Sequence, residues 1–482
     1  MLCMIMLVPA LASCGDNGAA STNTTATTPQ NGDSPTNKRI AELQADASGY
    51  DGKEFHMVGR YGGAAGDAFP IEDTITGNVE SDAVYKRNQA VETAFNVKIV
   101  GEKTENGPTA ADMVIKDQEA GTKTFHMGYG NIWSTLNILF NKGMFSPINN
   151  YAQIDLESPW WLGTMEEFYA IGDTLFFLSG DILPDFFNNA ALVLFSKKVM
   201  EDFDIGVNLY DLVTEGEWTI DKMFEVAAVI PGGGDIKRYG NANGGAGKAI
   251  YFGAGYTITQ FEADHMPTIA DAIPQEAYDL AVKVSAQTGD ESICYNLAFD
   301  IEDGSAGLRK MFAENKMLFN FDSAGGVAEL REEDANFGIL PIPKASADQK
   351  SYISLTGTGN DGSIYIPKVV DDPNFVGTIV EAMGAYSYQE IRPTFYDLRL
   401  KSKSVYDVES KAMLDIIYST QVYDLYDLYG GGDFNHGAGP ISSAIEEGFF
   451  TKTDNLISTY NSEKKLTLKN IKSMVKQAAT MS

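Results

Sequence analysis

The apolar positions of this chain come in short blocks separated by polar segments, and this pattern predicts strands and helices in alternation. The strand-like blocks are residues 54–59, 97–100, 175–179, 191–196, 317–321, 338–342 and 363–367. The segments 82–95, 375–386 and 412–419 place their apolar side chains at helical spacing. Strands that alternate with helices of these lengths favour an α/β fold with mostly parallel sheets.

One helix start is well marked, in the stretch EGEWTIDKMFEVAAVI. Thr219 is a suitable N-cap, and Met223, Ala227 and Ile230 form an apolar stripe behind it. We expect Trp218 to pack beneath this cap. Near the end of the chain, SEKKLTLKNIKSMVKQ predicts another amphipathic helix, whose lysine-rich face we expect in solvent.

The first residues, MLCMIMLVPALASCG, form a short apolar run that stops at a lone cysteine. Residues 2–11 are too short to cross a hydrocarbon core of ~30 Å as a helix, but they suit the apolar region of a signal peptide. Leu11-Ala12-Ser13-Cys14 resembles the bacterial lipoprotein box, in which the cysteine is lipidated. The alternative is a buried N-terminal helix with an incidental cysteine.

A polar tract rich in Ser, Thr and Asn follows this cysteine and cannot bury enough apolar surface to order itself. We therefore expect residues 1–14 to be a lipoprotein signal peptide and Cys14 to be the lipidation site. Residues 15–52 are expected to be a flexible tether that holds a folded body away from a membrane.

Composition limits what the folded body can do. The 482 residues are enough for two domains after the leader and the tether. The 66 acidic and 36 basic residues give a formal net charge of -30, which repels phosphate backbones and argues against nucleic-acid binding. Cys294 is the one cysteine beyond the leader, so no intrachain disulfide and no cysteine metal cluster are expected.

A search for catalytic motifs finds none that is complete. No HExxH or G-x-S-x-G occurs, and the four histidines are far apart in the sequence. Gly247-Lys248 ends a glycine-rich run, but the leading glycine and the hydroxyl of a phosphate loop are absent. We therefore predict no catalytic residues, no metal site and no cofactor.

Aromatic residues make up 11% of the chain, and several lie where a predicted strand gives way to a loop. Open α/β sheets bind ligands beyond the carboxyl ends of their strands. Aromatic faces suit the apolar faces of sugar rings, and Asp, Asn and Gln can bond the ring hydroxyls. The alternative for most of these aromatic residues is that they fill cores.

From residue 52 onward, the order of segments resembles the extracellular solute-binding proteins of bacterial ABC importers, of the carbohydrate-binding kind to which maltose-binding protein belongs. The resemblance lies in IDLESPWW, LFFLSGD, ALVLFSKKVMEDF, EGEWTIDKM, MLFNFDSAGG, FGILPIPK and IYIPKVVDDPNFVGTIVEAM, in that order. Together with the lipoprotein box, this ordered set is specific for the superfamily and says little about the ligand.

The resemblance implies a two-lobed periplasmic-binding-protein type II fold, with a ligand cleft between the lobes. Residues 53–153 plus 354–395 are expected in the first lobe, and residues 154–353 plus 396–482 in the second. The hinge crossings are expected near residues 151–159, 350–355 and 393–403.

The resemblance also implies ligand contacts at particular positions. These are Arg60, Tyr61, Tyr129, Trp133, Trp161, Asp181, Tyr256, Gln260, Asp322 and Ser323. Tyr256 and Gln260 are assigned from AIYFGAGYTITQF, which matches a family strand and the loop behind it. Family members often have a tryptophan after the MLFNF strand, where this chain has SAGG, so a linear malto-oligosaccharide ligand is in doubt.

The function implied is capture of a sugar or oligosaccharide by a monomeric receptor, lipid-anchored at the extracellular face of the cell membrane. Its partners would be the transmembrane subunits of an ABC permease and a cytoplasmic ATPase. One alternative is a lipid-anchored enzyme acting on glycans, which needs two converging carboxylates. Another is a binding protein for a peptide or polyamine, which needs a cleft lined by carboxylates.

Overall fold

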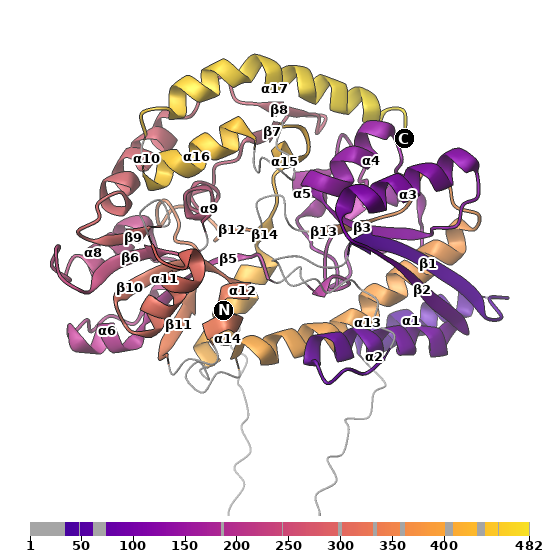
Figure 1. The fold of residues 1–482 in the computed structure, drawn as a ribbon, viewed down its shortest axis with the longest axis horizontal. Helices are drawn as coiled ribbons and strands as arrows, with labels where there is room; N and C mark the ends of the chain where they lie inside the picture. Colours follow the sequence, from indigo (N-terminus) through magenta and orange to yellow (C-terminus); the bar gives the residue numbers. More distant parts are fainter. Residues whose placement is uncertain are drawn as a thin grey trace, which may run out of the picture.

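The structure is a computed structural model, and it describes residues 34–47, 49–60, 74–184, 188–242, 244–296, 301–330, 335–356, 362–400, 408–430, 439–451 and 453–481. Two lobes lie side by side in it, each built around its own sheet (Figure 1). Two long helices, α13 and α17, run along opposite edges of the molecule and touch both lobes.

The strands are β1 Lys53–Arg60, β2 Val97–Thr104, β3 Met127–Asn131, β4 Phe177–Leu178, β5 Ala191–Ser196, β6 Lys237–Asn241, β7 Thr259–Phe261, β8 Pro267–Ile269, β9 Cys294–Asn296, β10 Met317–Ser323, β11 Phe337–Leu340, β12 Ser354–Leu355, β13 Gly362–Tyr365 and β14 Gln421–Val422. All seven predicted strand blocks coincide with strands of this set, because each block is a short apolar run that the sheet buries.

The α-helices are α1 Pro35–Asp46, α2 Val79–Phe95, α3 Gly107–Ala120, α4 Asn137–Lys142, α5 Met165–Tyr169, α6 Lys197–Asp202, α7 Leu209–Thr214, α8 Ile220–Ala227, α9 Ala246–Gly253, α10 Gln275–Thr288, α11 Gly304–Ala313, α12 Ala324–Glu329, α13 Pro373–Leu400, α14 Val408–Ser419, α15 Tyr426–Tyr429, α16 Pro440–Phe450 and α17 Leu456–Ala478. A π-helix η1, Ile132–Leu136, and a 3-10 turn η2, Ile148–Asn150, complete the set.

The sheet of the first lobe has the strand order β2-β1-β3-β13-β4. β1 pairs in parallel with β2 and β3, while β13 is antiparallel to both β3 and β4. We expected residues 154–353, which include β4, in the second lobe. Because β4 belongs to the first sheet, the first lobe extends further along the sequence than we expected.

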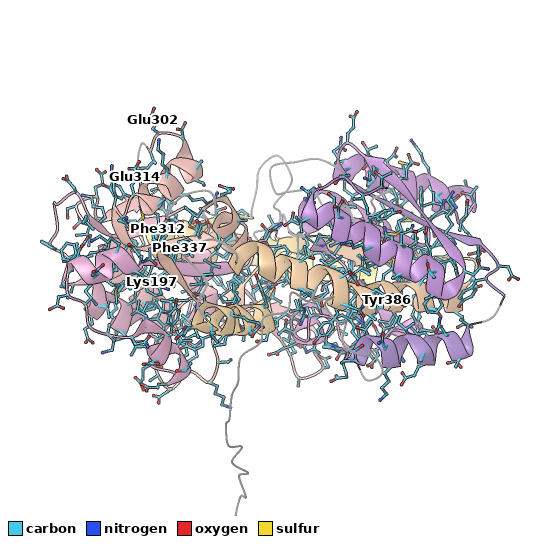
Figure 2. All side chains as sticks on the ribbon, turned by 90° about the horizontal axis from the view of Figure 1, so that it is seen from below. Lys197, Glu302, Phe312, Glu314, Phe337 and Tyr386 are labelled. Atoms are coloured by element: carbon cyan, nitrogen blue, oxygen red, sulfur yellow. The ribbon has the colours of Figure 1, made fainter. Side chains whose placement is uncertain are left out.

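The sheet of the second lobe has the strand order β11-β5-β10-β6-β9. β10, β6 and β9 run parallel, but β5 is antiparallel to β10 and β11. α11 covers this sheet, and Figure 2 shows its Phe312 beside Phe337 of β11, with ring centroids 5.9 Å apart.

Both sheets are therefore mixed, and the prediction of mostly parallel sheets is wrong. The reason lies in the connections between the lobes. β5 and β13 each enter their sheet directly from the other lobe rather than through a helical crossover within one lobe, so nothing forces them to be parallel.

The local signals for helix α8 are confirmed. Thr219 is its N-cap and accepts a hydrogen bond from the backbone N–H of Lys222 at 3.2 Å. Trp218 is fully buried, and its indole N–H donates to the carbonyl of Pro341 at 2.9 Å. The cap and the buried indole together fix where α8 begins, at the edge of the second sheet.

The first crossing between the sheets lies between β4 and β5, and not near residues 151–159 as expected. The second runs from β11 to β13 and includes β12, within the expected 350–355 region. The third is the C-terminal part of α13, which meets α12 and α14 of the second lobe.

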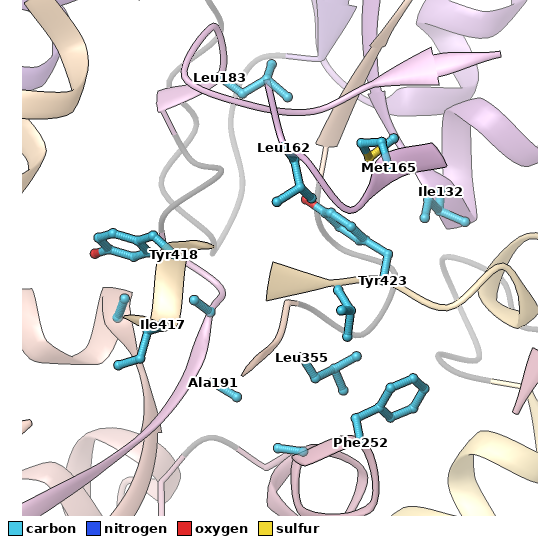
Figure 3. Close-up of a cluster of buried hydrophobic side chains, with 14 of the residues drawn as sticks. Ile132, Leu162, Met165, Leu183, Ala191, Phe252, Leu355, Ile417, Tyr418 and Tyr423 are labelled. Atoms are coloured by element: carbon cyan, nitrogen blue, oxygen red, sulfur yellow. The ribbon is translucent and has the colours of Figure 1, made fainter. Parts of the chain in front are cut away.

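Strands β12 and β14 form a small parallel ribbon between the lobes. Figure 3 shows the apolar side chains around it, with Leu162 and Met165 of the first lobe close to Tyr423. The hydroxyl of Thr164 donates to the carbonyl of Gln421, and Tyr169 packs edge-on against Tyr423 at 5.2 Å. This junction is buried, and both lobes contribute side chains to it.

Helix α1 corrects the expected tether, because residues 35–46 are folded. Thr36, Ile40 and Leu43 are buried, and the hydroxyl of Thr36 donates to the carbonyl of Ala385 in α13 at 2.9 Å. α1 is therefore part of the first lobe, and at most the residues before it can serve as a tether. Among the described helices, none is long and apolar enough to cross a membrane.

Candidate functional site

The candidate site lies where the strand ends of both lobes meet helix α15. η1 follows β3 in the first lobe and lies against α15. α9 follows β6 in the second lobe and is joined to α15 by an ion pair between Lys248 and Asp427. Figure 1 shows α15 between the two lobes, so the loops beyond these strands converge on one region.

Three strands end on a buried asparagine, one in the sheet of the first lobe and two in the sheet of the second. Asn131 is the last residue of β3, Asn241 of β6 and Asn296 of β9, and the side chains are 5%, 3% and 2% exposed. Asn241 and Asn296 are register partners in adjacent parallel strands. An amide both donates and accepts hydrogen bonds and carries no charge, so this set suits neutral polar ligands.

Asn131 is the best-defined of the three. Asn131 is the N-cap of η1. Its Oδ1 accepts hydrogen bonds from the backbone N–H of Ser134 at 3.0 Å and from the Ser134 hydroxyl. Its Nδ2 is buried and has no hydrogen-bond partner among the described residues. A buried donor without a partner is costly, so this position favours a group that can accept from it.

Asn241 makes a comparable turn in the second lobe. Its Oδ1 accepts from the backbone N–H of Gly244 at 3.1 Å, which holds the start of the loop between β6 and α9. Lys248, one turn into α9, is buried and bonds both carboxylate oxygens of Asp427, at 3.0 and 3.1 Å. The loop after β6 is thus fixed at both of its ends.

Two further carboxylates hold this region together. Asp424, just before α15, accepts hydrogen bonds from the backbone N–H groups of Ile258, Thr259 and Tyr426. Glu446 of α16 accepts from the backbone N–H groups of Gly247 and Lys248 in the first turn of α9. Burial raises the pKa of Glu446 to about 7, against the opposing effect of these two hydrogen bonds.

The described residues hold no group of three or more His, Cys, Asp or Glu side chains that could bind a metal ion. Cys294 is buried, and burial raises the pKa of its thiol. A buried thiol that stays protonated is a poor nucleophile and a poor metal ligand.

Several predicted positions lie outside what the structure describes. Tyr61 and Cys14 belong to segments that are not described, and neither are the side chains of Arg60 and Trp133. Their roles as ligand contacts and as lipidation site stay predictions. The backbone of Trp133 is in η1, the segment that lies against α15.

The two predicted aspartates have internal cationic partners. Asp181 is buried and accepts a hydrogen bond from Arg392 Nε at 3.0 Å. Asp322 is buried against Arg309, with Nη2–Oδ1 and Nε–Oδ2 distances of 2.8 and 3.0 Å. Both ion pairs join elements within the fold, and contact of either carboxylate with a ligand stays a prediction.

Three other predicted contacts also have structural roles. Trp161 is buried, and its indole N–H donates to Glu381 Oε2 of α13 at 2.9 Å. Ser323 caps α12 by accepting from the backbone N–H of Gly326. Tyr129 is buried on β3, where its ring lies directly against the backbone of Gly362.

The expected strand in AIYFGAGYTITQF is wrong in part. Its first residues belong to helix α9, and β7 begins only at Thr259. Tyr256 lies in the turn between them, half-buried beside Tyr251, with ring centroids 5.5 Å apart. Gln260 is exposed on β7. The small residues of α9, such as Gly247, let this helix pack closely against α16. The expectation of a strand did not take this into account.

The structure thus points to asparagines that the sequence reasoning passed over. The available signal was an asparagine that immediately follows an apolar or glycine-containing strand, as in MGYGN and KRYGN. Such a residue ends a strand and begins an Asx turn, and at the carboxyl end of a parallel strand it lies where ligands bind.

By sequence, no protein family and no curated protein matches the chain. By structure, the chain is similar to the GacH receptor of Streptomyces glaucescens, solved unliganded and with acarbose, at 11% identity and a TM-score of 0.52, over 87% of this chain and 99% of that one. It is similar to the ABC substrate-binding protein Lmo0181 of Listeria monocytogenes with cycloalternan, at 11% identity and a TM-score of 0.52, over 88% and 100% of the two chains.

A third similar structure is UgpB of Mycobacterium tuberculosis with glycerophosphocholine, at 11% identity and a TM-score of 0.51, over 89% of this chain and 100% of that one. At such low identity these likenesses speak for the fold alone. The chain has the two-lobed α/β fold of the periplasmic-binding-protein type II class.

Proposed function

We propose that this protein is a solute-binding receptor that captures a neutral sugar or oligosaccharide between its lobes and delivers it to an ABC permease. The observation that carries the proposal is the set of buried asparagines at the ends of β3 in the first lobe and of β6 and β9 in the second. Amide groups can bond ring hydroxyls as donors and as acceptors without favouring a charged ligand.

The carboxylates near α15 argue against the two alternatives considered from the sequence. Asp427 is bonded to Lys248, and Asp424 accepts three backbone N–H bonds. A glycan-active enzyme needs one carboxylic acid free to donate a proton and a second carboxylate facing it. A polyamine site needs carboxylates free to pair with the ligand. Both aspartates are instead engaged by the fold.

The similar structures support the sugar class. GacH was solved with acarbose and Lmo0181 with cycloalternan, which are both carbohydrate ligands. UgpB was solved with glycerophosphocholine, a charged ligand that also carries hydroxyl groups. A hydroxylated solute is therefore the chemistry we assign to this chain, with sugars first.

The remaining parts of the proposal follow from the same function. A lipid on Cys14 would hold the receptor at the outer face of the cell membrane, next to its permease. The receptor would act as a monomer, since one chain supplies both lobes. Closure around the solute would be the signal that the permease recognises.

The test is a thermal-shift screen of the protein carrying Cys14→Ser against mono- and oligosaccharides, glycerophosphocholine, peptides and polyamines. A solute at 100 times its Kd should stabilise the folded protein by about 2.7 kcal/mol. A sugar that raises Tm and is recovered unchanged supports the receptor. A sugar that is consumed, or a response to polyamines alone, contradicts it.

Variants then test the site itself. Asn131→Leu and Asn241→Leu should each weaken the Kd of the solute about tenfold, since each removes hydrogen bonds to it. Asn461→Leu, at an exposed position of α17, is the matched control and should leave the Kd unchanged. If all three variants bind the solute with the Kd of the wild type, the solute does not contact Asn131 or Asn241.

A further inference from the structure

A second contact between the lobes lies away from the hinge, where α17 passes over the first lobe. We name it the seam. It is formed by Asn137, Phe140 and Asn141 of α4, Leu428 and Tyr429 of α15, and Asn470, Ser473 and Met474 of α17. Figure 1 shows α17 reaching along one edge from the second lobe to α4 of the first, on the opposite side from α13.

Side-chain amides make the hydrogen bonds at the seam: two bond backbone carbonyls, and Asn141 Nδ2 donates to Asn137 Oδ1 within α4 at 2.6 Å. Asn137 Nδ2 donates to the carbonyl of Leu428 at 2.9 Å, and this bond joins the two lobes. Asn470 Nδ2 donates to the neighbouring carbonyl of Tyr429 at 3.0 Å, from within the second lobe. In the described part of the chain, no ion pair joins α4 to α15 or α17.

The packing at the seam is incomplete. Its eight residues surround a cavity of about 330 Å³, although Phe140 and Met474 supply apolar walls. Groups that line a cavity lose dispersion contacts, and amide groups can exchange protein partners for water at little net cost. The cavity and the amide bonds weaken the seam, while the buried side chains of Phe140 and Met474 still hold it together.

We propose that the seam is a latch that sets the balance between closed and open lobes, with Asn137 as its positioning residue. The proposal rests on the proposed function only in taking the lobes to move. Asn137 holds the last turn of α15, and α15 contacts η1 just beyond Asn131. The latch thus acts on the helix beside the candidate site without touching the solute.

The test measures the distance between the lobes without any solute. Spin labels at Lys116→Cys on α3 and Lys198→Cys on α6 report on the two lobes, and both side chains are exposed, at 73% and 48%. Cys3 and Cys14 are replaced by serine, and the buried Cys294 stays unlabelled. Double electron–electron resonance then gives the populations of closed and open lobes.

Asn137→Ala should raise the ratio of open to closed lobes roughly fivefold, the change that one net hydrogen bond corresponds to. Ser473→Met should lower the ratio, because the longer side chain fills the cavity from α17. Asn461→Ala, exposed on the same helix, is the control and should leave the distances unchanged. Opposite shifts at unchanged Tm cannot come from general loss of structure.

Identical distance distributions for the wild type, Asn137→Ala and Ser473→Met would overturn the latch. This outcome is separate from the fate of the receptor proposal. If the lobe distances respond to these substitutions but no solute binds, the receptor proposal fails and the latch proposal stands. If a sugar binds but Asn137→Ala leaves the lobe distances unchanged, the latch proposal fails and the receptor proposal stands.

Discussion

Helices α13 and α17 both span the lobes, yet they are built in different ways. Residues 375–385 of α13 are all buried, so this stretch of the helix is enclosed on every side. α17 buries a single stripe, Leu456, Tyr460, Thr467, Ile471, Met474 and Ala478, and leaves its lysines in solvent. A helix enclosed on all sides can move only with its surroundings, whereas a helix held along one stripe can part from one neighbour and keep the other.

The difference extends to the polar contacts. On α13, Glu381 is fully buried and bonds Arg39 of α1 at 3.1 Å and the indole of Trp161 at 2.9 Å. At the seam, the partly exposed amides of Asn137 and Asn470 each bond α15, beside a cavity that α4 and α17 line together. Separating a buried ion pair costs much free energy, whereas separating an amide from its partner costs little when water can replace that partner. We therefore expect α13 to hold the structure rigid and α17 to allow the lobes to move.

The strongest test of this contrast is Glu381→Ala. We expect it to lower the free energy of unfolding by about 3 kcal/mol, because it leaves the buried Trp161 indole without an acceptor and removes the buried one of the two carboxylates that pair with Arg39. Urea unfolding measures the loss. Glu381→Gln keeps an oxygen acceptor and should lose less, and a loss below about 1 kcal/mol for the alanine variant would show that α13 is not the rigid element.

A second test asks whether a substitution in α13 raises or lowers the free energy of unfolding. A Cβ atom at Gly384 of α13 would lie 2.6 Å from Trp160 Cδ1 and 2.9 Å from Trp161 Cζ2. Gly384→Ala should therefore destabilise the protein by about 1–3 kcal/mol, although helix propensity alone would favour alanine by about 1 kcal/mol. A stabilised variant in the same unfolding assay would mean that the two indoles leave room.

The third test concerns a charge on the α17 side of the molecule. The folded-state pKa of Glu446 is raised to about 7, so its favourable contribution is complete below its unfolded pKa near 4.5 and is lost as the pH rises through 7. Tm should therefore fall between about pH 5 and pH 8. Glu446→Gln should flatten this part of the profile, and an unchanged slope would assign the effect to other groups.

The smallest effect is expected at the seam. Ser473→Ala removes an exposed hydroxyl from a helix that favours alanine, so the free energy of unfolding should change by no more than about 0.5 kcal/mol. Thermal unfolding at a fixed pH is sufficient to measure it. A loss as large as that of Gly384→Ala would erase the distinction between the two helices.

Local patterns predicted the secondary structure well. The block 191–196 coincides fully with β5, because every residue of that strand is buried and the run is apolar throughout. Thr219 marked the start of α8 for a similarly local reason, its bond to the third residue after it. Signals of this kind depend only on neighbours in the chain.

Long-range pairing is what the sequence could not reveal. α1 has few apolar residues, and Arg39 fixes it to Glu381, 342 positions away. Asp181 and Asp322 looked available for a ligand because their arginine partners, Arg392 and Arg309, could not be assigned. The asparagines at the strand ends could be compared only once the strand order of the two sheets was known, because that order makes Asn241 and Asn296 neighbours.

The docking of α1 also decides where a mechanical load enters the molecule. Any pull on α1 from its N-terminal end reaches Thr36 and then Arg39, and it passes through Ala385 and Glu381 into the buried stretch of α13. The load therefore enters the molecule through the first lobe and reaches the second lobe along α13, which meets α12 and α14 there.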